Sequence, residues 1–157
     1  MKKILILLFL FLLVPVVRAE EEDLAPNAKS AIMIEASTGE ILFQKNKDEK
    51  LAPASMTKMM SMLLIMEEIE KGNLKWDEMI TASERAASMG GSQIFLKVGE
   101  KMSVTDMVKG ISIASGNDAT VAMAERISGS EESFVKKMND RAKELGLKNT
   151  NFINATG

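Results

Sequence analysis

The sequence predicts an α+β fold in which a β-hairpin precedes a mainly helical part. Two short runs rich in β-forming residues, 30–35 and 40–45, with Gly39 in the turn between them, indicate the hairpin. The helical part is indicated by apolar residues at helical spacing, in segments that carry capping residues at their ends.

Residues 1–19 are expected to be a secretory signal peptide and not part of the fold. Lys2-Lys3 precede an apolar run, 4–17, and a small-residue cleavage site ends at Ala19. The run is short for a membrane span, although an uncleaved membrane anchor is the alternative. We therefore expect an exported protein, outside the cytoplasmic membrane, whose mature chain starts at residue 20 and forms one domain.

The chain contains neither histidine nor cysteine, and these absences exclude several chemistries. A Ser-His-Asp triad needs histidine, and thiol catalysis and Cys/His zinc sites need the missing residue types. No metal and no cofactor are expected. The net charge of −2, without a basic stripe, argues against a nucleic-acid partner. A serine hydrolase built from this chain would need lysine as its base.

The first candidate site is the Ser55-Met-Thr-Lys58 segment. Pro53 and a capping Gly72 predict a helix of about four to five turns, buried on most sides, with Ser55 at its start. Lys58 would lie on the same helix face as Ser55, and a neutral lysine amine can take a serine proton. A serine at a helix start also offers its N–H to an oxyanion. The same spacing recurs at Ser133–Lys136, so ordinary helix-start chemistry is the alternative.

Further elements follow along the chain. A partly helical segment, an extended piece and a capped helix are expected at residues 77–88, 93–100 and 103–114. The last helix should bury a stripe of apolar side chains and end at Gly146, before a loop at 148–157. The residues of that stripe are Phe134, Met138, Ala142 and Leu145.

The second candidate site is Ser115-Gly116-Asn117, between two apolar helical stretches. A serine hydroxyl can pass a proton on, and an asparagine amide both donates and accepts. The alternative is structural: Gly116 as the C-cap of one helix and an Asn or Asp as the N-cap of the next.

In this order and spacing, the two motifs resemble those of the low-molecular-mass penicillin-binding proteins, the serine-type D-alanyl-D-alanine carboxypeptidases. Gly90-Gly-Ser92 and the segment Asn151-Phe-Ile-Asn-Ala-Thr-Gly157 are also similar to that family. The resemblance implies a β-lactamase/DD-peptidase-like (transpeptidase-like) fold that acts on peptidoglycan stem peptides ending in D-Ala-D-Ala. It also implies that β-lactam antibiotics are covalent inhibitors.

The resemblance gives each candidate residue a role. Ser55 would be the nucleophile that attacks the penultimate D-alanine carbonyl, and Lys58 would be its general base. Ser115 would relay a proton to the leaving D-alanine. Asn117 would bind substrate, with hydrogen bonds to Lys58 and to the substrate amide.

The family's third motif, a Lys-Thr-Gly strand, does not occur before Gly157. Residues 20–157 are therefore expected to be the N-terminal part of the catalytic domain, without its C-terminal sheet strands, and a poor enzyme alone. Membrane contact is expected only from a C-terminal region. A β-lactamase-like hydrolase is one alternative, although Ser-Gly-Asn replaces its Ser-Asp-Asn and its Glu-x-x-Leu-Asn is missing. A non-catalytic secreted binding module of the same fold is the other.

Overall fold

The computed structural model describes residues 23–157, so the expected signal peptide, 1–19, lies outside the described residues. The described residues divide between Lys50 and Leu51 into two compact units. None of the helices within 23–157 combines the length and the apolar character that crossing a membrane requires.

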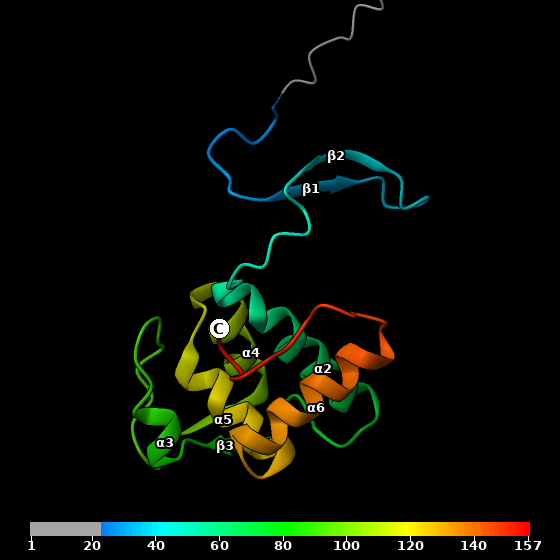
Figure 1. Ribbon diagram of the computed structural model, residues 1–157. Coiled ribbons are helices and arrows are strands. Elements are labelled where there is room, and N and C mark those ends of the chain that lie inside the picture. The colour runs from blue at the N-terminus through cyan, green and yellow to red at the C-terminus, as the bar shows by residue number, and fades with distance from the viewer. Residues whose placement is uncertain (1–22) are drawn as a thin grey trace, which may run out of the picture. The chain divides into compact units, whose positions relative to one another are not determined.

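The first unit contains the predicted hairpin (Figure 1). Strands β1 (Ala31–Ile34) and β2 (Ile41–Lys45) pair antiparallel, with a register irregularity between Met33 and Ile34. Gly39 lies in the turn with a φ of 75°, as its lack of a side chain allows. The Glu35 carboxylate accepts hydrogen bonds from Ser37 and Thr38, and these bonds lower the pKa of Glu35 to about 2. The hairpin prediction is confirmed.

The second unit is mainly helical and holds both candidate motifs (Figure 1). Its helices are η1 (Ala54–Thr57), α2 (Lys58–Glu70), α3 (Glu84–Ala87), α4 (Val104–Ala114), α5 (Asn117–Ser128) and α6 (Glu131–Glu144). A small antiparallel sheet pairs β3 (Met79–Thr81) with β4 (Lys101–Ser103). Helix α5 is central, since it contacts α2, α3, α4 and α6. Its buried alanines, among them Ala119, Ala122 and Ala124, leave room for those neighbours.

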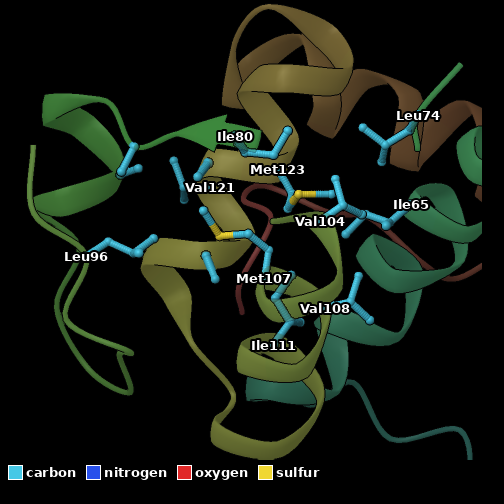
Figure 2. Close-up of a cluster of buried hydrophobic side chains, with 14 residues drawn as sticks. Ile65, Leu74, Ile80, Leu96, Val104, Met107, Val108, Ile111, Val121 and Met123 are labelled. Carbon is cyan, nitrogen blue, oxygen red and sulfur yellow. The ribbon is translucent and has the colours of Figure 1, made fainter. Parts of the chain in front are cut away.

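Two apolar clusters hold the second unit together. The larger one gathers side chains such as Ile65, Met107 and Val121 from α2, α4 and α5 (Figure 2). The smaller one packs α2 and α6 against the C-terminal segment, with Phe134 and Ala155 fully buried. Burying a phenylalanine side chain contributes about 1.5–3 kcal/mol. The clusters therefore fix the helices that carry the candidate site residues.

Residues 77–88 are partly helical, as expected, since the short α3 follows β3. The capped helices also lie where the sequence predicts them, but two expectations are wrong. Residues 93–100 form no strand, because the N–H groups of Ile94 and Leu96 donate to a side chain and not to a neighbouring strand. Leu145 is exposed, because α6 ends one residue earlier.

Helix α2 is also less buried than predicted. It buries one stripe, and Met59 is exposed, as is Met56 in the preceding turn. The prediction of burial on most sides followed from the apolar run, in which methionine fits both a core and a surface.

The N-cap of α4 gives a test of local stability. Ser103 Oγ accepts the N–H of Asp106 at 3.1 Å. We expect Ser103→Ala to lower the free energy of unfolding by about 1 kcal/mol, because a helix N–H loses its acceptor. Urea denaturation followed by circular dichroism measures the change.

Ser112→Ala is the matched control in the same helix. The Ser112 hydroxyl donates back to the Val108 and Lys109 carbonyls of its own helix, so its loss should change stability by less than about 0.5 kcal/mol. Equal losses for the two variants would show that capping does not account for the Ser103 effect.

Candidate active site

Ser55 and Lys58 are in direct contact at the start of α2. Ser55 is exposed and lies in η1, one 3-10 turn ahead of the α-helix, whereas Lys58 is the first residue of α2. The Lys58 Nζ lies 3.2 Å from Ser55 Oγ. An accessible hydroxyl therefore sits within hydrogen-bond reach of a buried amine, the geometry that a nucleophile and its base require.

The surroundings of Lys58 favour its neutral form. Its side chain is only 5% exposed, and this burial lowers the pKa of the amine from its ordinary value. Its hydrogen-bond partners are the Ser55 hydroxyl and the Thr156 backbone carbonyl, at 3.0 Å. Neither partner is charged, so neither opposes the effect of burial.

The C-terminal segment supplies the carbonyl that Lys58 contacts, and several side chains hold this segment in place. Asn139 on α6 clasps Phe152, since its amide donates to the Phe152 carbonyl and its Oδ1 accepts the Phe152 N–H, both at 2.8 Å. Ser61, one turn beyond Lys58 on α2, donates to the Ala155 carbonyl at 2.7 Å. The loop expected at 148–157 is therefore part of the lysine's surroundings.

Ser115 ends α4 in the left-handed conformation, with a φ of 56°. Its Oγ is buried and has no hydrogen-bond partner within residues 23–157. Gly116 has a negative φ and is the N-cap of α5. The structural alternative for this turn is therefore wrong in detail: a serine, not the glycine, takes the left-handed cap position. A buried hydroxyl without a partner is available to exchange a proton with a ligand.

Asn117 begins α5 and holds the loop before α4. Its Nδ2 donates to the Gly90 carbonyl and its backbone N–H donates to the Ser92 carbonyl, both at 2.7 Å. The resemblance implied a hydrogen bond between Asn117 and Lys58, and none is formed among the described residues. Since α4 and α5 both pack against α2, the Ser115–Asn117 turn and the Ser55–Lys58 pair belong to one packed unit.

The sequence reasoning missed three contributors to this region: Ser61, Thr156 and Asp118. Ser61 is a fully buried polar residue inside the apolar run 59–66, and that interruption was the available signal. Thr156 acts through its backbone, which no side-chain pattern marks. Asp118 is a buried acid directly after the second motif. No group of three or more potential metal-binding side chains occurs within the described part of the chain.

Comparisons with known proteins identify the family of the chain. A family model described as D-alanyl-D-alanine carboxypeptidase matches residues 16–157. The chain is 67% identical over 135 residues to the D-alanyl-D-alanine carboxypeptidase DacF of Bacillus subtilis, a match that covers 86% of this chain and 35% of that protein.

Solved structures give the same picture for the fold. The D-alanyl-D-alanine carboxypeptidase DacD of Francisella tularensis matches with a TM-score of 0.83 at 44% identity, over 90% of this chain and 34% of that one. Penicillin binding protein 5 of Haemophilus influenzae matches with a TM-score of 0.80 at 38% identity, over 83% and 39%. The predicted DD-peptidase-like α+β fold is confirmed, and the chain spans about a third of the curated relative DacF.

The bond between Ser61 and the C-terminal segment can be tested by itself. We expect Ser61→Ala to lower the free energy of unfolding by about 1–3 kcal/mol, because the buried Ala155 carbonyl loses its donor. The measurement is the urea denaturation midpoint. Ser133→Ala, the same change on an exposed face of α6, should stay within about 0.5 kcal/mol of the parent. Indistinguishable midpoints for the two variants would contradict a structural role for the Ser61 bond.

Proposed function

The chain belongs to the family of D-alanyl-D-alanine carboxypeptidases, and from this premise we propose that the full-length protein is a serine-type D-Ala-D-Ala carboxypeptidase. Its substrate would be a peptidoglycan stem peptide ending in D-Ala-D-Ala, from which it removes the terminal D-alanine. The observation that carries the proposal is the 3.2 Å contact between the hydroxyl of the exposed Ser55 and the amine of Lys58, which is buried among uncharged groups.

In the proposed acylation step, the neutral Lys58 amine accepts the Ser55 proton across their 3.2 Å contact. Ser55 Oγ then attacks the carbonyl carbon of the penultimate D-alanine, and the carbonyl oxygen becomes an oxyanion. The backbone N–H of Ser55, at the N-terminal end of the η1 and α2 helices, is one donor for that oxyanion.

The peptide bond to the terminal D-alanine breaks when its nitrogen receives a proton. The Ser115 Oγ, which is buried and has no hydrogen-bond partner in the described part of the chain, supports a role as the relay of that proton. With its Nδ2 bound to the Gly90 carbonyl, Asn117 would accept the N–H of the substrate amide with its Oδ1. Water then hydrolyses the ester on Ser55 and regenerates the hydroxyl.

The same acylation would make β-lactams covalent inhibitors, and the name of the related Haemophilus influenzae penicillin binding protein 5 supports this part of the proposal. The signal peptide expected at residues 1–19 supports a site of action outside the cytoplasmic membrane, where peptidoglycan lies.

We predict that labelled penicillin acylates Ser55 and no other serine of the full-length protein. Ser55 is exposed and adjoins a lysine of lowered pKa, whereas Ser133, with the same spacing to Lys136, lies on a helix whose lysine forms an ion pair with Asp140. Peptide mass spectrometry locates the adduct, and Ser55→Ala should abolish it. An adduct on Ser133 would sink the assignment, and rapid steady-state hydrolysis of the penicillin would favour the β-lactamase alternative.

We predict that Lys58→Ala and Lys58→Arg both slow acylation by about a hundred- to ten-thousandfold, the usual contribution of a general base. Arginine fails because its guanidinium stays protonated. Rates of adduct formation with labelled penicillin, measured on variants with unchanged circular dichroism, check this. Acylation of either variant near the parent rate would show that another group takes the proton.

The pH profile of the parent protein completes this test. Because burial lowers the pKa of Lys58, the acylation rate should rise with pH through a midpoint below the ordinary lysine value of 10.5. The folded protein then binds fewer protons than the unfolded chain between that midpoint and 10.5, so this group makes the fold more stable as pH rises through the window. The ascending limb should be absent from Lys58→Ala.

A further inference from the structure

We infer that Asp118 is a positioning residue for acylation, which fixes the loop 89–99 against the Ser115–Asn117 turn. This inference rests on the proposed function for its consequence, but its structural basis is independent of that function. It gives the buried Asp118 carboxylate a role, although Asp118 belongs to neither of the two candidate motifs.

The Asp118 carboxylate is 1% exposed, and backbone donors surround it. Both of its oxygens lie 3.1 Å from the Ile94 nitrogen, and its Oδ2 accepts the Leu96 N–H at 3.0 Å. Its Oδ1 also accepts the N–H of Ala119 at 2.9 Å. A carboxylate taken out of water requires such donors. Asp118 therefore binds two loop residues that lie on either side of Phe95.

The backbone conformation of Phe95 shows that the hydrogen bonds to Asp118 constrain the loop. It has a φ of 61°, which is unfavourable for a bulky side chain, and its side chain is 79% exposed. Because the Phe95 ring is exposed, its burial within this unit contributes little that could offset the cost of the unfavourable φ. Because the N–H groups of both neighbours converge on one carboxylate, the backbone at Phe95 is bent between them. The conformation is thus imposed by Asp118.

The constrained loop also anchors the second motif. The Gly90 and Ser92 carbonyls accept the side-chain and backbone N–H groups of Asn117. Ile94 packs so closely on α4 that a Cβ added at Gly110 would lie 2.9 Å from its Cδ1. The loop, the end of α4 and the start of α5 therefore move together. If the loop relaxed, Asn117 would lose the carbonyl that orients its amide.

Asp118→Asn tests the inference, because the amide keeps the size of the carboxylate but turns one acceptor into a donor that faces backbone N–H groups. We expect the rate of acylation of the full-length protein by labelled penicillin to fall by about ten- to a hundredfold, as for a misplaced reacting group. Hydrogen exchange at the Ile94 and Leu96 amides should accelerate. Glu125→Gln, the same chemical change on the same helix, should alter neither measurement.

A second substitution supplies a rescue that a general loss of stability would not give. Glycine takes a positive φ without strain, so Phe95→Gly should return part of the acylation rate to the Asp118→Asn protein. In the parent protein, Phe95→Gly should raise the melting temperature. This measurement does not need the Asp118→Asn variant, so it tests the inference even if that variant does not fold. A lowered melting temperature would overturn the inference.

Two other outcomes would also overturn it: unchanged exchange at Ile94 and Leu96, or parent-like acylation despite faster exchange. The proposed function fails separately. If the parent protein is not acylated by penicillin at all, that function is wrong, whereas the exchange measurements still decide whether Asp118 holds the loop.

Discussion

The site depends on an amine taken out of water beside neutral partners. Lys58 is buried, and its neighbours are a hydroxyl and a backbone carbonyl. These groups satisfy its hydrogen bonds but carry no charge, so they do not compensate the cost of burying an ammonium group. A carboxylate in place of the Thr156 carbonyl would have the opposite effect and keep the lysine as an ammonium. In a chain without histidine, this choice of partners supports the role of base that we propose for Lys58.

The features that could be predicted from the sequence are those specified by neighbouring residues. The hairpin followed from two β-rich runs and a turn glycine, and the start of α4 followed from Ser103 and Asp106, three positions apart. The Ser55–Lys58 contact also spans three positions, so helix geometry alone brings the two side chains together. Such sequence signals involve residues within one turn of each other, and the tertiary structure does not override the local structure that they specify.

What could not be predicted is set by bonds from a side chain to a distant backbone. The sequence of residues 93–100 predicts an extended segment, but Asp118 accepts hydrogen bonds from two of its N–H groups. The spacing of apolar residues along the sequence does not indicate such bonds. Likewise, Asn139 and Ser61 fix the C-terminal segment through its backbone. The resemblance to a family implied a bond between Asn117 and Lys58, but the Asn117 Nδ2 donates to the Gly90 carbonyl.

The carbonyl that Lys58 contacts is 98 residues further along the chain, and the one that Ser61 contacts is 94 positions beyond it. Contacts of this sequence separation form late, because a long loop must first close. An incompletely folded chain would therefore carry the serine while its lysine is hydrated, protonated and inert. Local opening of the C-terminal segment would have the same effect in the folded protein, since water would return to the amine while α2 stayed intact. The reactivity that we propose for Ser55 is thus coupled to completion of the fold.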